Sequence, residues 1–390
     1  MTNTSSLTRV NLAGQPSETS HLSREEKIAW WRLINTENVG PVTFYQLLSR
    51  FKNVFEALKR LPRIAHKAGR QNPLRIPTLD EAEWCFDAYE KKGFHLIAFS
   101  EPSYPDALRA LPDAPPLLSA KGDLGLLKTD CFAVVGARTA SALGQEVAYN
   151  WSQNLADAGM TIVSGLANGI DTSAHKATLL TGTIAVLASG LDKPYPPENM
   201  PLYERIAEEG IILSEAPLGT EPHANLFPRR NRLISGLSWG VLVVEAAVKS
   251  GSILTAHYAL EQGRQVFVVP GHPQDPRSRG GNRLIQEGAI LCQGPQDILD
   301  VRAQPMTLKE DGKSVLYNLQ STQDKTEDAE EVTQAVRDKI CKLLTQTPTS
   351  PENIQLLTGL SAPLVKAALV ELTVAGRVAH TLLGHIFTPP

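Results

Sequence analysis

The sequence is poor in cysteine, in long apolar runs and in net charge, and each shortage removes a class of protein. Its four cysteines form no C-x-x-C pair and have no histidine at ligand spacing. We therefore expect buried, reduced thiols and no metal site at positions Cys85, Cys131, Cys292 and Cys341. No apolar run approaches the roughly 18 to 20 residues that a membrane helix needs, so we expect no membrane contact.

The first 21 residues are rich in Ser, Thr and Asn and lack the basic-then-apolar pattern of a signal peptide. We expect residues 1–21 to be disordered and the protein to be soluble and cytoplasmic. A net charge of −3 over 390 residues gives no overall attraction to nucleic acid. Any polyanion site must come from a local concentration of Lys and Arg.

Helical spacing of apolar residues marks an N-terminal module, which we place at 22–100. Two helical stretches lie within 23–51 and are separated by a turn at Asn38, Gly40 and Pro41. A glycine turn between short helices is typical of a helix-hairpin-helix, whose backbone N–H groups can meet a phosphate. A small helical packing module would have the same pattern, and both interpretations stay open.

Between 101 and 300, short apolar runs alternate with amphipathic stretches. Apolar runs without polar alternation suit strands that are covered on both faces, as in a parallel sheet between helices. The predicted strands are 131–135, 161–164, 183–188, 211–214, 241–244 and 266–269, and the predicted helices are 142–158, 170–180, 202–209 and 253–261. The pattern predicts a doubly wound α/β domain, which binds its ligands at the carboxyl ends of the strands.

A polar, charged stretch at 301–330 reads as a linker. Beyond it, 332–344, 351–358 and 362–375 have helical patterns, and 377–379 and 382–388 predict a β-hairpin around Gly384. Three helices and a hairpin indicate a winged-helix domain at 331–390. The predicted second helix of its helix-turn-helix, 362–375, offers only Lys366 as a cation. This favours a protein-contact or dimer-support role over the reading of duplex DNA.

Two strand-to-helix turns of the α/β domain carry glycine. The first holds Gly136, Arg138 and Ser141, and the second holds Gly165. Glycine lets the backbone approach a phosphate, the helix start supplies free N–H groups, and Arg138 adds a charge-assisted contact. A turn glycine beside a surface arginine would look the same. The spacing is not G-x-G-x-x-G and no ribose-binding acid follows the second strand, so we expect no dinucleotide cofactor.

The second turn leads into a helix with Asp171 near its start and His175 one turn further on. We interpret Asp171 as a cap. No nucleophile or second acid is identifiable beside His175, so we interpret it as structural. The chain therefore offers no catalytic residue.

The densest basic cluster follows in 225–238. Between Phe227 and Ile285 there are eight Lys or Arg against three Asp or Glu. Cations at a helix start are unfavourable beside the helix dipole, so another interaction should stabilise them, and DNA backbone phosphates would do so. An aromatic ring in the same cluster can stack on a base. A solvated helix start is the alternative. The candidate residues of this cluster are Phe227, Arg229, Arg230, Asn231 and Arg232.

A further turn, Lys249, Ser250, Gly251 and Ser252, offers one flexible cation, two hydroxyls and a row of helix-start N–H groups. Turns after successive strands fall along one edge of a sheet, so together they favour an extended polyanion over one small molecule. No Walker lysine motif or Ser-His-Asp arrangement accompanies them.

The ordered blocks VGAR, SGLANGID, YPPEN, FPRRNRLISGLS, VVEAAVKSGSILTA and GGNRLIQEGA closely resemble the DNA-processing protein A (DprA, or Smf) family. The resemblance covers 104–299 strongly. It implies a Rossmann-like domain at 101–300, flanked by a helical domain of the sterile-alpha-motif type and a winged helix. It also implies a non-enzymatic protein that binds and protects incoming single-stranded DNA, loads the recombinase RecA in natural transformation, and forms a homodimer.

The resemblance assigns the DNA contacts to Arg138, Arg230, Asn231, Arg232, Lys249, Ser250 and Ser252, with Gly136 and Gly251 allowing close approach. For the dimer we expect apolar segments at the sheet edge after Val269, such as Leu284, Ile285 and Ile290–Leu291. Two rival classes stay open. A phosphoribohydrolase of similar architecture would need a glutamate after a P-G-G-x-G-T turn, which 249–255 lacks, and a transcription factor would use the winged helix on duplex DNA.

Overall fold

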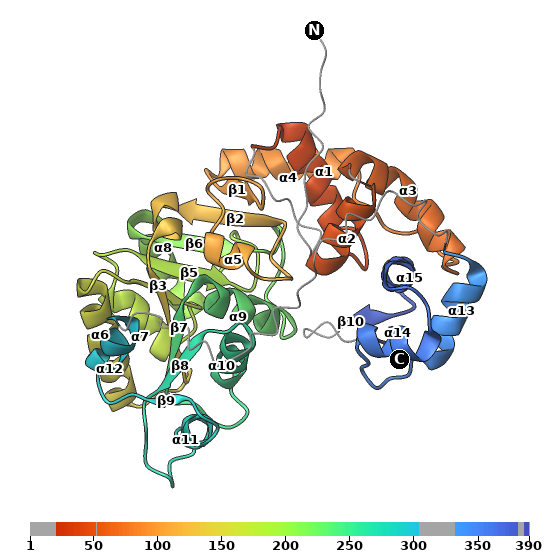
Figure 1. Ribbon diagram of the computed structural model, residues 1–390. Coiled ribbons are helices and arrows are strands. Elements are labelled where there is room, and N and C mark those ends of the chain that lie inside the picture. Colours follow the sequence, from red (N-terminus) through yellow and green to blue (C-terminus); the bar gives the residue numbers. More distant parts are fainter. Residues whose placement is uncertain (1–20, 52, 304–331, 381–385, 390) are drawn as a thin grey trace. The chain divides into compact units, whose positions relative to one another are not determined.

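The computed structural model describes residues 21–51, 53–303, 332–380 and 386–389. The chain forms two compact units (Figure 1). Unit 1 comprises Met1–Trp31 and Thr78–Val301, and unit 2 comprises Arg32–Pro77 and Arg302–Pro390. Helix α1, Arg24–Ile34, runs across the division between them. The predicted N-terminus 1–20 and nearly all of the predicted linker lie outside the described residues, while 301–303 close helix α12.

Unit 1 is built on a nine-stranded sheet in the order β1-β2-β6-β5-β4-β3-β7-β8-β9. The seven strands from β6 to β9 run parallel, and β2 and β1 add an antiparallel edge beside β6. In chain order the strands are β1 His95–Ala98, β2 Leu117–Gly122, β3 Cys131–Gly136, β4 Thr161–Ser164, β5 Thr183–Leu187, β6 Ile211–Ser214, β7 Gly240–Val244, β8 Gln265–Val268 and β9 Ile290–Leu291. The predicted doubly wound α/β fold is confirmed, and the antiparallel edge is an addition.

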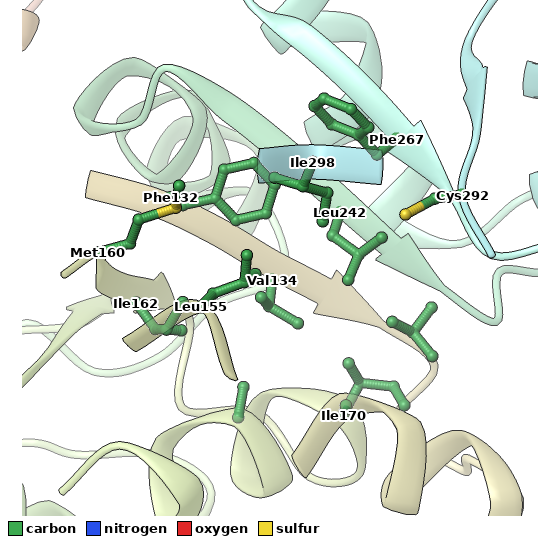
Figure 2. Packing of buried hydrophobic residues seen from close by; sticks show 13 residues of the cluster. Phe132, Val134, Leu155, Met160, Ile162, Ile170, Leu242, Phe267, Cys292 and Ile298 are labelled. Carbon is green, nitrogen blue, oxygen red and sulfur yellow. The ribbon is translucent and has the colours of Figure 1, made fainter. Parts of the chain in front are cut away.

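Helices cover both faces of this sheet because successive strand residues point to opposite sides and both sides are apolar. One face of β3 sends Phe132 and Val134 into a cluster with Leu155 of α6 and Ile170 of α7, shown in Figure 2. Helices α9 and α10 pack against the strands from the other face. The helices of unit 1 after α1 are α4 Leu79–Lys91, α5 Asp106–Arg109, α6 Ala142–Asp157, α7 Ile170–Ala177, α8 Met200–Glu209, α9 Leu226–Leu237, α10 Gly251–Glu261, α11 Arg279–Gln286 and α12 Pro295–Ala303.

Unit 2 joins two N-terminal helices to the C-terminal module. Its helices are α2 Pro41–Phe51, α3 Val54–Lys67, α13 Gln334–Leu343, α14 Pro351–Thr358 and α15 Ala362–Val374, with the short hairpin β10 Ala379–His380 and β11 Ile386–Phe387. Helix α14 has ordinary local signals: Ser350 caps its first turn, Pro351 follows, and Gly359 ends it with a φ of 64°. The three helices and paired strands of the predicted winged helix are therefore confirmed, while Gly384, around which we predicted the hairpin to turn, lies outside the described residues.

The C-terminal module packs against α2 and α3 through α15. Glu371 of α15 is buried and accepts hydrogen bonds from Arg337 at 2.6 and 2.8 Å and from Arg50 of α2 at 2.9 Å. Asn38, before α2, also donates to the Val374 carbonyl at 3.4 Å. Residues that are far apart in the sequence thus share one unit, a relationship that composition and periodicity do not indicate.

Candidate functional site

The order of strands reverses between β3 and β7, the position at which doubly wound sheets usually hold a ligand. Here the crevice is closed by the carboxylate of Glu245, which follows β7. Glu245 accepts the backbone N–H of Ser141 at 2.9 Å and the Ser141 hydroxyl, and that hydroxyl in turn accepts from Gly144 N at 2.9 Å. A negative side chain therefore occupies the start of α6, where a phosphate would have to sit.

The structure gives Gly136 a packing role that the sequence did not indicate. A Cβ at this position would lie 1.9 Å from the Val244 carbonyl oxygen and 2.5 Å from Ile170. The packing of β3 against β7 and α7 therefore requires a glycine here by itself, and the predicted phosphate contact of Gly136 stays a prediction. In the same turn, Arg138 is exposed.

The second glycine turn is also closed by the chain itself. The Asp171 carboxylate accepts N–H groups from Gly165 at 3.1 Å and Ala167 at 3.3 Å. Burial raises the pKa of Asp171, an effect that Arg230 and these amides oppose. At Gly165 a Cβ would lie 2.2 Å from the Arg230 guanidinium, so this glycine makes room for an arginine.

His175 is fully buried behind this turn. Its Nε2 accepts from Leu166 N at 3.3 Å, and its Nδ1 lies 2.9 Å from the Thr183 hydroxyl, which itself donates to Ile162 O. Burial, together with the nearby charge of Arg230, lowers the pKa of His175 to about 3. The ring is neutral and holds the loop, which agrees with the structural role that we predicted.

Arg230 is buried, with 5% of its surface exposed, although the sequence suggested a surface position. Its guanidinium donates to the carbonyls of Gly165 at 2.5 Å and Val186 at 2.6 Å, beside the Asp171 carboxylate. Burial lowers the pKa of Arg230 to about 10, partly offset by Asp171. The cation at this helix start is therefore stabilised by contacts within the protein, through which Arg230 ties α9 to the carboxyl ends of β4 and β5.

Arg232 is also buried rather than exposed. It forms ion pairs with Glu215 and with Asp113, the latter at 3.2 Å, and donates to the Asp113 carbonyl at 2.9 Å. Asn231, between the two arginines, donates to the Gly251 carbonyl at 3.1 Å and so links α9 to the start of α10. Of the three arginines in this cluster, only Arg229 is exposed, and its Nε lies 3.6 Å from Glu215.

The turn before α10 differs from the first two because it remains open. A Cβ on Gly251 would meet only Asn231 Nδ2, at 3.7 Å, and no side chain caps the first turn of α10. Ser250 and Ser252 hydrogen-bond each other at 2.8 Å, with Ser252 buried. Lys249 is exposed beside them. The described chain therefore offers one helix start with free N–H groups, an adjacent cation and space for an anion.

This open turn is held rigidly. The Ala246 carbonyl accepts from Gly280 N at 2.8 Å and Gly281 N at 3.2 Å, both at the start of α11. Glu245, one residue earlier, is fixed to Ser141. These two anchors hold the chain before the turn, and the hydrogen bond from Asn231 to the Gly251 carbonyl holds it after the turn.

A second exposed cluster gathers around Phe227, one turn before Asn231 on α9. The Arg138 guanidinium lies over the Phe227 ring at 5.0 Å, and that of Arg230 at 5.9 Å. The ring of Tyr195 stands at 60° to Phe227, with the centroids 6.1 Å apart. Phe227 itself is half-buried. Cationic and aromatic groups thus lie together at the carboxyl edge of the sheet.

Sequence reasoning missed Glu245 and Tyr195. Glu245 stands alone after a strand, and its φ of 53° shows a backbone conformation that residue type alone does not signal. Tyr195 stood in a block, YPPEN, that carried the family resemblance, but its place beside Phe227 depends on the packing of two distant loops.

Within the described residues, no group of three or more His, Cys, Asp or Glu side chains is placed to hold a metal ion. Cys85, Cys131 and Cys292 are buried and Cys341 is partly exposed. No described helix is by itself long and apolar enough to cross a membrane; α14 and α15 pass the test of length and composition only as a pair bent by 117°.

Three family models match the chain. The model of DNA recombination-mediator protein A matches residues 95–303, a DprA-like N-terminal HHH domain matches 24–88, and a DprA winged helix domain matches 324–381. The first alone covers more than half of the sequence. The chain belongs to the DprA family. The HHH match favours the helix-hairpin-helix interpretation of the N-terminal helices over a plain packing module.

Individual relatives agree with this assignment. DNA processing protein DprA of Bacillus subtilis is 44% identical over 216 residues, which are 55% of this chain and 73% of that protein. The structure of DNA processing protein A from Streptococcus pneumoniae superposes with a TM-score of 0.59 at 36% identity, over 72% of this chain and 98% of that one. DNA processing protein A from Helicobacter pylori, solved to show its single-stranded DNA binding mode, gives 0.50 at 31% identity, over 54% and 95%.

Proposed function

We propose that this protein binds and protects single-stranded DNA at the carboxyl edge of its sheet, without catalysis, and loads the recombinase RecA onto it during natural transformation. The observation that carries the proposal is the contrast between turns. Glu245 and Asp171 close two of them with the chain's own carboxylates, whereas the Lys249–Gly251 turn is open and cationic. An open helix start beside a lysine suits one phosphate of a polyanion.

The residues around this turn suit a strand rather than a small molecule. Arg138, on the turn after β3, and Arg229, in the first turn of α9, are exposed, and Tyr195 presents an aromatic ring beside Phe227. Spaced cations with an aromatic group hold single strands without reading sequence. The single-stranded DNA named for the Helicobacter pylori relative supports the same ligand.

The absence of catalysis is part of the proposal. His175, the one histidine at this edge that we singled out, is neutral, buried and bonded to Leu166 and Thr183. The carboxylates of Asp171 and Glu245 are engaged by backbone N–H groups. A general acid or base needs access to its substrate, which these side chains lack.

RecA, a homodimer and a cytoplasmic location complete the proposal. The description of the matching family as recombination mediators supports a recombinase partner. For the dimer, β9 is the last strand of the sheet and Leu291 is 45% exposed there. Leu284, which we also expected at the interface, is buried inside unit 1, so we no longer include it in the proposed interface. Two subunits would align two DNA sites on one strand and raise avidity.

The winged helix is not proposed to read duplex DNA. Helix α15, which would enter a groove, is buried along most of its length and packs against α2 and α3 of the same unit. Its acidic residue Glu371 is enclosed between Arg337 and Arg50. A protein-contact role, as the sequence favoured, suits this arrangement better.

The test is a comparison of single-stranded and duplex oligonucleotides of equal length, by fluorescence anisotropy across a salt series. We expect sequence-independent preference for the single strand and an affinity that falls steeply with salt. Lys249→Gln is the matched variant, since it keeps length and polarity but removes the charge. Equal affinity for both forms, or an affinity that ignores salt, would contradict the proposed function.

A further inference from the structure

Tyr195 stands on the loop between β5 and the short 3₁₀ helix Pro197–Asn199 and keeps 43% of its surface exposed. Exposure alone does not mark a site, since Trp84 is 72% exposed, and what distinguishes Tyr195 is its place beside Phe227. Its ring lies edge-on to Phe227, 6.1 Å away, and Phe227 also carries the guanidinium of the exposed Arg138 over its ring.

The loop that carries Tyr195 is anchored at both ends. After it, Asn199 donates to the Leu166 carbonyl and to the Thr172 hydroxyl, each at 2.9 Å. Before it, the Ser189 hydroxyl donates to the Lys193 carbonyl at 2.6 Å. The Asn199 bonds tie the end of the loop to the turn after β4, and the Ser189 bond closes the first part of the loop on itself, so the fold restricts the backbone at Tyr195 before any ligand binds.

Phe227 is less suited to receive a base than its place in the sequence suggested. Two guanidinium groups, those of Arg138 and Arg230, already lie over its ring. A base that stacked on Phe227 would have to compete with them. In the described part of the chain no cation lies over the Tyr195 ring, so its surface is available.

We propose that Tyr195 is a base-stacking residue for single-stranded DNA, while Phe227 acts indirectly by holding the Arg138 guanidinium toward the strand. The inference rests on the proposed function and adds to it a specific contact with a nucleobase. Stacking is tolerant of sequence because every base has a π face, which suits binding without readout. The phosphate contacts remain with Lys249 and Arg138.

Two variants and two probes separate stacking from packing. Tyr195→Phe keeps the ring, and Tyr195→Leu keeps an apolar side chain without it. Each is titrated with an oligothymidylate and with an abasic strand of the same length. We expect Tyr195→Leu to bind oligothymidylate about tenfold more weakly, in the range for loss of one base–aromatic stack, and to bind the abasic strand as wild type does. Tyr195→Phe should stay within about twofold on both.

The salt dependence gives an independent readout. Removing a stack leaves the number of neutralised phosphates unchanged, so the salt slope of Tyr195→Leu should equal that of wild type, whereas Lys249→Gln should lower it on both strands. Equal binding of oligothymidylate by Tyr195→Leu and wild type would overturn this inference alone. So would an equal loss on the abasic strand, which would mean that Tyr195 merely supports Phe227. Failure of wild type to bind either strand would overturn the proposed function as well.

Discussion

The backbone N–H of Ser141 donates to the Glu245 carboxylate at 2.9 Å, and this contact decides what the sheet can bind. It brings the end of β7 to the start of α6 and fills the crevice in which related architectures bind a nucleotide. The Rossmann-like fold is therefore kept while its usual phosphate position is closed. We therefore place the proposed DNA contacts further along the edge, near Lys249 and Arg138.

Ser141 provides the first prediction. Its hydroxyl caps α6 at Gly144 and meets Glu245, so Ser141→Ala should lower the free energy of unfolding by about 0.5–2 kcal/mol, the usual cost of a lost helix cap. Affinity for single-stranded DNA should stay unchanged at temperatures where the variant is folded. Urea unfolding and anisotropy titration measure the two effects. A stable variant with weakened binding would return Ser141 to the DNA site, where the sequence alone had placed it.

Neighbouring arginines on α9 provide a matched pair. Arg230→Ala would remove the buried hydrogen bonds to the Gly165 and Val186 carbonyls, and each buried acceptor left without a partner costs about 1–3 kcal/mol. Arg229→Ala, at an exposed position, should change stability by no more than about 0.5 kcal/mol and reduce the salt slope of DNA binding by about 1.

The readouts for this pair are chemical denaturation and the salt series. Similar, small stability effects for both variants would show that Arg230 is not the structural residue that its burial indicates. Arg232, held by Glu215 and Asp113, should behave like Arg230 rather than like Arg229.

The burial of Arg230 and Arg232 shows which features of the protein could be predicted from the sequence and which could not. Runs of apolar residues located every strand from β3 to β8 because each run is covered on both faces, and the blocks around them identified the family. The segment FPRRN, however, does not show by its sequence whether each arginine faces solvent or pairs with a carboxylate inside the protein. The partners of Arg230 and Arg232 come from segments 17 to 119 positions away, such as Glu215 and Asp113, and only the folded chain brings them together.

Gly251 tests the open turn. A Cβ at this position meets only Asn231, at 3.7 Å, so Gly251→Ala should fold normally. The bulkier Gly251→Val tests whether a ligand needs the open space beside Gly251. We expect DNA affinity to fall from glycine to alanine to valine although no charge is lost. Thermal unfolding checks the fold. Gly136→Ala is the contrast, since its Cβ would lie 1.9 Å from the Val244 carbonyl and should destabilise the protein itself. Undiminished binding by Gly251→Val would remove this turn from the DNA site.

His175 predicts a pH dependence of stability. Its pKa is about 3 in the folded protein and about 6.5 in an unfolded chain, so between these values the unfolded state binds more protons. Stability should therefore fall as the pH drops below about 6.5, with a slope of up to about 1.4 kcal/mol per pH unit from this residue. Asp171, whose pKa is raised, contributes in the opposite direction. The difference between wild type and His175→Gln in urea unfolding from pH 7 to 5 isolates the histidine, and parallel curves would contradict its burial in the neutral form.

Glu371 tests whether α2 and the winged helix form one unit. Its carboxylate accepts from buried Arg337 and from Arg50 of α2, so Glu371→Gln should leave a buried guanidinium without its charge partner and lower stability by about 3–5 kcal/mol. The loss should reach both segments, with faster amide hydrogen exchange in α2 as well as in α15. Leu356→Ser, at a position 81% exposed on α14, serves as the control and should change stability by no more than about 0.5 kcal/mol. Exchange that accelerates in α13 and α15 while α2 stays protected would show that the winged helix folds independently of the N-terminal helices.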